Sequence, residues 1–226
     1  MKTIGMIGGT TWESTKEYYR IINQLTQQRL GGVHSAKILL YSVDFNFILS
    51  SDWPEKIELL SEKAQLLEKA GADCLLICAN TLHKLYDDIQ SSVNIPIIHI
   101  AEAVGNTIQN KGLNKVGLLG TRPTMEEDFY KKRLKENFRI ETVIPDEESR
   151  IFIQQVIYKE LAKGIFSEES KQKYIDICEN LISKGAEGVI LGCTEIPLLI
   201  SQEDFDIPVF DTAFIHAAAA VDFALE

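Results

Sequence analysis

Short apolar runs alternate along this chain with longer segments whose apolar residues recur every three or four positions. Short runs of this kind are typical of buried strands, and the longer spacing is typical of helices packed on one face. In the first half, the predicted strands are 3–7, 37–43, 71–78 and 95–100, and the predicted helices are 14–30, 55–70 and 102–110, with a further helix starting near Thr81. Alternating strands and helices predict parallel sheets with right-handed crossovers.

The second half repeats the landmarks of the first half at a nearly constant offset. Gly5 and Gly117, Gly8 and Gly120, and Ile95-Pro96 and Ile207-Pro208 are each 112 residues apart, and Gly71 and Gly185 are 114 apart. A constant offset between several landmarks indicates an internal duplication. We therefore predict an α/β fold of two pseudo-symmetric lobes, each a parallel sheet flanked by helices, with the active site in the cleft between the lobes. The predicted lobes are 1–100 with 207–226, and 101–206.

Composition narrows the class of protein. The chain has 226 residues, of which 45% are hydrophobic and 25% charged, and its formal net charge is −10. An acidic chain of this kind is a poor partner for nucleic acid or an anionic membrane surface. Its four cysteines form neither a CxxC motif nor a His/Cys metal spacing, and the N-terminus reads directly into a strand rather than a signal peptide. We expect a cytoplasmic protein with no metal, no nucleic acid and no membrane among its partners.

The stretch 185–197 is the most informative part of the chain. It reads as a buried strand, 188–191, followed by a Gly192-Cys193-Thr194-Glu195 turn that presents one thiol. A near copy occupies 71–81. An alignment that starts from Gly71 and Gly185 places Asn80 opposite Thr194, but it places Ala79, not Cys78, opposite Cys193.

Both turns follow strands of the predicted sheets, where ligands of parallel sheets bind. Polar turns from two lobes could hold a small molecule between groups that act on its opposite faces. Inversion at an α-carbon needs such a pair, a base on one face and an acid on the other. A stabilised thiolate can serve in this role, and main-chain N–H groups at the start of a helix can bind a carboxylate.

The paired motifs Cys78-Ala79-Asn80-Thr81 and Gly192-Cys193-Thr194-Glu195 resemble those of the aspartate/glutamate racemase family. Gly8-Gly9-Thr10, Gly120-Thr121 and Pro96-Ile97-Ile98-His99 add to this resemblance, which spans nearly the whole chain. The resemblance implies an isomerase, namely a homodimeric amino-acid racemase that acts on aspartate or glutamate by a two-base mechanism without a cofactor.

The resemblance also implies roles for individual residues. Cys193 becomes one acid/base, Asn80, Thr81 and Thr194 hold the α-carboxylate, and Thr10 and Thr121 line the cleft. The chain departs from the family pattern at Ala79, where relatives carry a residue able to transfer a proton. Cys78 is therefore either a displaced second catalytic thiol or a core residue.

A second carboxylate on the substrate needs a cation, and the sequence offers Arg122 and Lys163. Three functions remain open. The first is a racemase that uses Cys193 and Cys78. The second is a one-thiol isomerase or decarboxylase of a small dicarboxylate that uses Cys193 alone. The third is a catalytically impaired acid-binding homologue, which would bind its ligand without turnover.

Overall fold

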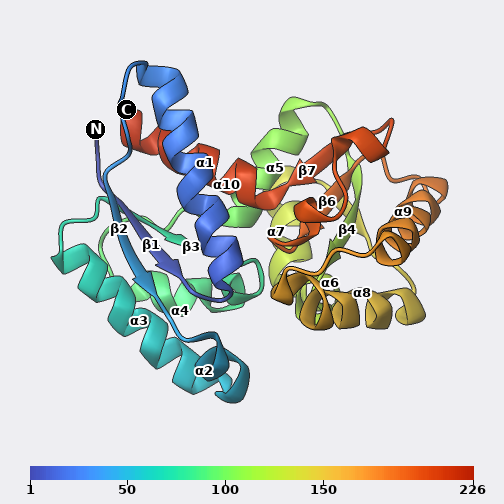
Figure 1. Ribbon diagram of the computed structural model, residues 1–226, viewed down its shortest axis with the longest axis horizontal. Helices are drawn as coiled ribbons and strands as arrows, with labels where there is room; N and C mark the ends of the chain where they lie inside the picture. Colours follow the sequence, from blue (N-terminus) through green and yellow to red (C-terminus); the bar gives the residue numbers. More distant parts are fainter. The chain divides into compact units, whose positions relative to one another are not determined.

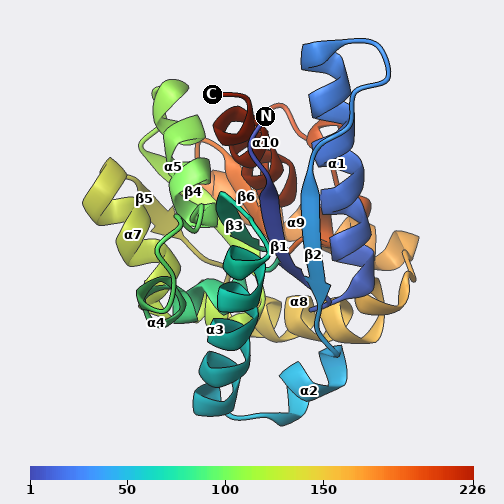
Figure 2. The same ribbon diagram turned by 90° about the vertical axis from the view of Figure 1, so that its left-hand side faces the viewer.

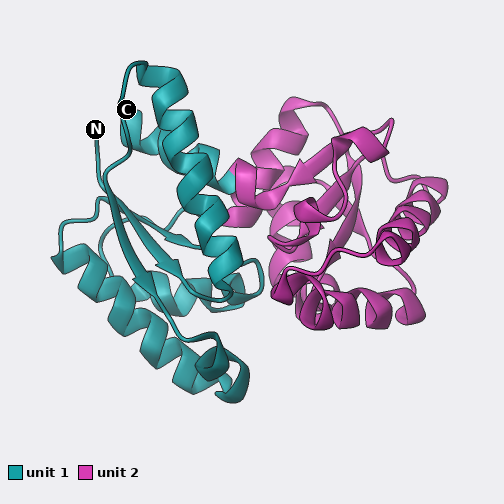
Figure 3. Ribbon diagram, viewed as in Figure 1, with its two compact units in different colours: residues 1–99, 216–226 teal, residues 100–215 magenta.

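The structure, a computed structural model, describes residues 1–226 (Figure 1) and divides into two compact units (Figure 3). Unit 1 comprises Met1–His99 and His216–Glu226, and unit 2 comprises Ile100–Ile215. The sequence analysis assigned 207–215 to the first lobe, whereas the structure places them in unit 2. The reason is that strand β7 within this segment pairs with strand β6 of unit 2.

The elements follow one another as alternating strands and helices, with short 3-10 helices labelled η. Those before residue 100 are β1 (Ile4–Gly8), α1 (Trp12–Leu30), β2 (Ile38–Ser42), α2 (Phe45–Ser50), α3 (Trp53–Lys69), β3 (Cys74–Ile77), η1 (Thr81–Leu85) and α4 (Tyr86–Ser91). The remainder are α5 (Ile100–Asn110), β4 (Lys115–Gly120), α6 (Arg122–Glu126), α7 (Asp128–Phe138), β5 (Glu141–Val143), α8 (Glu147–Lys159), η2 (Leu161–Lys163), α9 (Glu168–Ser183), β6 (Val189–Gly192), η3 (Ile196–Leu198), η4 (Gln202–Asp204), β7 (Val209–Asp211) and α10 (Thr212–Leu225). The boundary between the units falls within α10.

The two sheets have the same strand order, which is the structural counterpart of the sequence repeat. All strands are parallel, in the order β2-β1-β3 in unit 1 and β5-β4-β6-β7 in unit 2. The fourth strand of unit 1 is reduced to a single bridge between Leu75 and Ile97, which corresponds to the pairing of Val189 with Val209 in unit 2. The α/β class with two parallel sheets flanked by helices is confirmed.

The sheet of unit 1 is covered by helices on both faces (Figure 2). On one face, Ile7, Leu75 and Ile77 form a core with side chains of α3 and α4. On the other face α1 approaches so closely that a Cβ atom on Gly8 would lie 2.5 Å from Thr15 Cγ2. Because side chains alternate across a strand, strands buried on both faces read as continuous apolar runs. This explains the runs from which the strands were predicted.

The sheet of unit 2 has the same layered construction. Leu119, Val189 and Leu191 pack on one face with apolar residues of α8 and α9. On the other face, Leu118 and Ile190 pack with α5 and α7.

Several helix starts are marked by polar caps. Asp52 and Glu55 form a reciprocal capping box, which begins α3 two residues before the predicted start of that helix.

No helix of the chain combines the length and apolar character that crossing a lipid bilayer requires.

Candidate active site

Except for Lys163, the predicted site residues follow strands that meet where the strand order of each sheet reverses direction. In a parallel sheet ligands bind beyond the carboxyl ends of the strands at this switch point. In unit 2 it falls between β4 and β6, where Gly120 pairs with Gly192, so that Thr121 and Cys193 follow at the same edge. In unit 1 it falls between β1 and β3, which lead into Thr10 and Cys78.

Glycine allows β4 and β6 to approach closely at this edge of unit 2. A Cβ atom on Gly192 would lie 2.6 Å from the main-chain oxygen of Leu119, and one on Gly120 would lie 2.7 Å from the oxygen of Gly192. No side chain fits between the strands at this point. Cys193, the first residue after β6, therefore follows a strand end at which only glycine fits.

The Cys193 thiol is held against a buried carboxylate. Its Sγ atom donates a hydrogen bond to Glu195 Oε2 over 2.9 Å, and Thr194 Oγ1 donates to the same oxygen, also over 2.9 Å. Cys193 is 8% exposed and Glu195 is 4% exposed. Sequence reasoning selected Cys193 and Thr194 but missed Glu195. The sequence feature that could have revealed this contact is the acidic residue two positions after the cysteine. The turn brings its side chain back to the thiol.

Burial, followed by the negative charge of Glu195, raises the pKa of the Cys193 thiol well above its ordinary value. Hydrogen bonds from the main-chain N–H groups of Thr194 and Glu195 act in the opposite direction, since they favour the thiolate. Cys193 therefore rests as a thiol at neutral pH, but its sulfur already faces donors that would stabilise a thiolate. Such a group can both deliver and take up a proton.

Two further residues of unit 2 belong to this edge. Thr121, the residue before α6, is buried, and its hydroxyl lies 3.1 Å from that of Thr124. Tyr158 of α8 lies close enough to Cys193 and Glu195 for their charges to raise its pKa, after the larger effect of burial. Tyr158 was not predicted, because its proximity depends on how α8 packs on the sheet.

The unit 1 edge presents hydroxyl groups and main-chain atoms rather than an exposed thiol. The carbonyl of Cys78 accepts hydrogen bonds from Ser14 Oγ at 3.2 Å and Thr10 Oγ1 at 3.5 Å. The Cys78 side chain is 0% exposed, and burial raises the pKa of its thiol strongly. The structure therefore brings Cys78 to the predicted edge but leaves its thiol in the interior.

The turn after Cys78 rests on a buried histidine cluster. Asn80 is buried and Thr81 is partly buried; Asn80 precedes the 3-10 helix η1, which starts at Thr81, where the sequence predicted the start of a helix. His83 donates from Nδ1 to the carbonyl of Ala79 over 2.8 Å, and its ring lies 4.7 Å from that of His99 and 5.4 Å from that of His216. These contacts fix the main chain of the Cys78–Asn80 turn.

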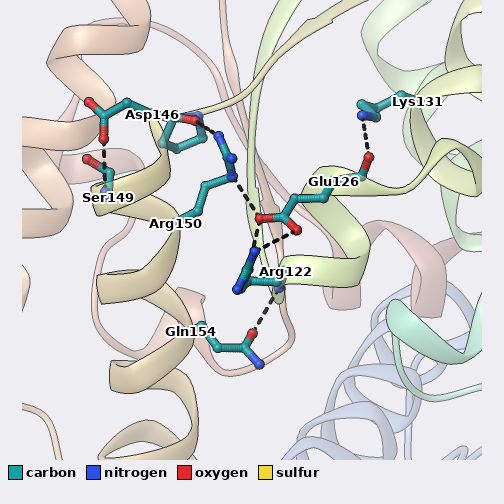
Figure 4. A network of polar contacts seen from close by, with 8 residues as sticks. Arg122, Glu126, Lys131, Asp146, Ser149, Arg150 and Gln154 are labelled. Carbon is teal, nitrogen blue, oxygen red and sulfur yellow. Dashed lines mark hydrogen bonds and ion pairs between the residues drawn. The ribbon is translucent and has the colours of Figure 1, made fainter.

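The two predicted cations differ in their surroundings. Arg122 points toward Glu126, which also accepts a hydrogen bond from Arg150 (Figure 4). Lys163 ends the short helix η2, is exposed, and its ammonium group has neither an ion-pair nor a hydrogen-bond partner in the structure. Of these two cations, Arg122 is therefore the one that would have to give up an ion pair in order to bind another carboxylate.

No set of three or more His, Cys, Asp or Glu side chains converges as a metal site would require.

A sequence model of the Asp/Glu/Hydantoin racemase family matches residues 7–220. The chain belongs to this family. The predicted membership is confirmed, and with it the isomerase class of the named relatives.

Known proteins of this kind match the chain over its whole length. The broad-specificity amino-acid racemase RacX of Bacillus subtilis is 25% identical in an alignment over 223 residues, which covers 96% of this chain and 96% of RacX. A crystal structure from Yersinia pestis, provisionally described as an Asp/Glu racemase, is 48% identical with a TM-score of 0.93 and full coverage of both chains. An aspartate racemase homologue from Pyrococcus horikoshii is 39% identical with a TM-score of 0.89, again with full coverage of both.

Proposed function

We propose that this protein is an amino-acid racemase that acts on aspartate or glutamate, with Cys193 as one acid/base and no cofactor. The observation that carries the proposal is the Cys193 thiol, which is placed at the switch point of its sheet and hydrogen-bonded to a buried carboxylate. An acid/base that acts in both directions must hold a proton at rest and must also be able to lose it. Family membership and the named activity of RacX support the same reaction class.

The second acid/base is proposed to be Cys78, which acts together with Cys193 on one substrate molecule. This role requires a local movement, because the Cys78 thiol is fully buried. Thr10, Asn80, Thr81, Thr121 and Thr194 are proposed to bind the substrate, with the α-carboxylate held by the turns after β3 and β6. The homodimer and the cytoplasmic location remain predictions.

The burial of Cys78 specifically favours a second candidate function. A one-thiol isomerase or decarboxylase of a small dicarboxylate would need only Cys193. Such an enzyme would not depend on any movement at Cys78.

The test is α-proton exchange in D2O, followed by NMR for both enantiomers of aspartate, glutamate and alanine. The proposal predicts exchange and interconversion from both enantiomers of an acidic amino acid, in dialysed protein without added cofactor. Exchange from a single enantiomer without interconversion would support the one-thiol function instead.

Replacing Lys163 by methionine is expected to raise KM for aspartate and glutamate by about tenfold or more. The reason is that a hydrogen bond between charged groups contributes about 1.5–3 kcal/mol. KM for alanine should change little, because alanine has no second carboxylate. Lys159→Met is the matched control, since Lys159 is an exposed lysine at the end of α8. Equal changes for acidic and neutral substrates would argue against the role of Lys163 in specificity.

A further inference from the structure

The segment between α8 and α9 carries Lys163 and is joined to both helices through Glu160. Glu160 lies between the end of α8 and the start of η2, and its Oε2 atom accepts hydrogen bonds from Ser167 Oγ at 3.1 Å and Ser170 Oγ at 2.8 Å. Ser167 is also the N-cap of α9, since its Oγ accepts from the main-chain N–H of Ser170 over 3.1 Å. The carboxylate therefore lies at the N-terminus of α9, where the helix dipole favours a negative charge.

The main chain of Glu160 closes the same segment into a compact loop. Its carbonyl accepts hydrogen bonds from the N–H groups of Lys163 at 2.8 Å and Ile165 at 3.1 Å. Gly164, between these two residues, has a φ of 71°, a left-handed conformation that favours glycine. Glu160 thus fixes this loop, residues 160–167, through both its side chain and its main chain.

Packing fixes only one part of the 160–167 loop. Leu161 is fully buried in the cluster that also contains Cys193, so the base of the loop and the Cys193 turn share one core. Beyond Lys163, the side chains of Ile165 and Phe166 are 50% and 47% exposed. Because these half-exposed side chains gain less from burial, the hydrogen bonds to Glu160 must supply much of what holds the part of the loop that carries Lys163.

We propose that Glu160 is a positioning residue for substrate specificity, which holds Lys163 where its ammonium group meets the second carboxylate of an acidic amino acid. The inference rests on the proposed racemase function and deepens it. Glu160 does not touch the substrate in this scheme and acts only through Lys163. A lysine on a loop that is fixed before the substrate arrives loses less conformational entropy on binding than one on a loop that samples several positions.

The test compares KM for aspartate and glutamate with KM for alanine in Glu160→Ala. We expect KM for the acidic substrates to rise about tenfold, because a hydrogen bond to a charged group contributes at least that factor to an equilibrium. The values of kcat and of KM for alanine should change little. Ser170→Ala, which removes one of the two hydroxyl donors, should act in the same direction by a smaller factor. An equal rise of KM for acidic and neutral substrates would show a merely structural role and overturn the proposal.

A double-mutant cycle shows whether Glu160 acts through Lys163. In the Lys163→Met background, Glu160→Ala should leave the ratio of KM for acidic and neutral substrates unchanged, since there is no ammonium group to position. A further rise of this ratio in that background would overturn the proposal.

The conservative variant Glu160→Gln separates the hydrogen bonds of Glu160 from its charge. Glutamine keeps an oxygen that can accept from both serine hydroxyl groups, so this variant should retain most of the preference for acidic substrates. A loss as large as that in Glu160→Ala would place the role in the negative charge rather than in the hold on the loop, and would contradict the proposal.

Cleavage by trypsin after Lys163 gives a readout that does not depend on racemase activity. The Lys163–Gly164 bond must leave the folded loop before the protease can cut it, so its cleavage rate, measured on peptides by mass spectrometry, reports how often the loop opens. Glu160→Ala should raise this rate about tenfold, and an unchanged rate would overturn the proposal. Glu169→Ala, which removes an exposed carboxylate from the first turn of α9, is the matched control. It should alter neither the cleavage rate nor the KM ratio.

These arms separate a failure of this inference from a failure of the proposed function. A wild type that turns over no amino acid refutes the proposed function and with it the specificity role, whereas the trypsin arm still decides whether Glu160 fixes the loop. A wild type that racemises amino acids, but whose Glu160→Ala variant keeps the wild-type KM ratio, refutes the role of Glu160 alone.

Discussion

Replacing Cys193 by alanine is expected to stop interconversion of the enantiomers and to reduce exchange of the α-proton that faces it by about 10³-fold. Alanine cannot transfer a proton, and acid–base catalysis by a positioned side chain contributes about 10²–10⁴-fold. The measurement is NMR-detected exchange in D2O on each enantiomer separately. Because Cys193 packs against apolar residues of α8 and α9, its replacement can also destabilise the fold. The thermal unfolding temperature of the variant must therefore be measured together with its exchange rate. Cys178→Ala, which removes a fully buried thiol of α9, is the control for packing.

The parallel experiment at Cys78 separates the racemase from the one-thiol enzyme. If Cys78 is the second acid/base, Cys78→Ala loses interconversion but keeps exchange from the enantiomer whose α-proton faces Cys193. The one-thiol function predicts instead that Cys78→Ala leaves turnover unchanged. Cys74→Ala is a close control, since both thiols are fully buried at the two ends of the same strand region. Full exchange from both enantiomers in Cys193→Ala would refute both functions.

Much of the fold was predictable because the signals are local. The doubly buried strands read as apolar runs, and the repeated glycines mark equivalent points in the two units. The fourth strand of unit 1 shows where this reasoning fails. Only Ile97 bridges to Leu75, whereas β7 in unit 2 pairs with β6 over three residues. The local sequence does not account for the difference, because Pro96 and the helix start at Ile100 have counterparts in unit 2, namely Pro208 and Thr212.

The candidate site was predictable to the extent that strand ends position it. Cys193 and Thr194 follow β6 as expected, but the side-chain direction of Glu195 depends on the conformation of a turn. Arg122 illustrates a missed local signal, because Glu126 lies four residues later on the same short helix and pairs with it. The histidine cluster was out of reach, since residues 83, 99 and 216 come together only through the tertiary fold.

Acidification between pH 6.5 and 4.5 is expected to lower the free energy of unfolding through His216. Complete burial, and to a lesser degree the charge of His83, lowers the pKa of His216 from 6.5 to about 3. Because the folded protein binds this proton less tightly than the unfolded chain, the stabilisation is complete above pH 6.5. It is lost as the pH falls toward 3. Linkage gives a loss of about 1 kcal/mol at pH 5.5 and roughly 2–3 kcal/mol at pH 4.5.

Glutamine at position 216 is the variant that isolates this effect. His216 donates from Nε2 to the carbonyl of Ile98 over 2.7 Å and accepts at Nδ1 from the Tyr18 hydroxyl over 2.8 Å. A glutamine amide offers one donor and one acceptor for the same partners but does not titrate. Urea unfolding of His216→Gln should therefore lose its stability less steeply with falling pH than the wild type. His34→Gln, at an exposed histidine, should retain the wild-type slope. If His216→Gln also kept that slope, the acid sensitivity would have to arise at other groups, because the only titrating atom at this position would have been removed without effect.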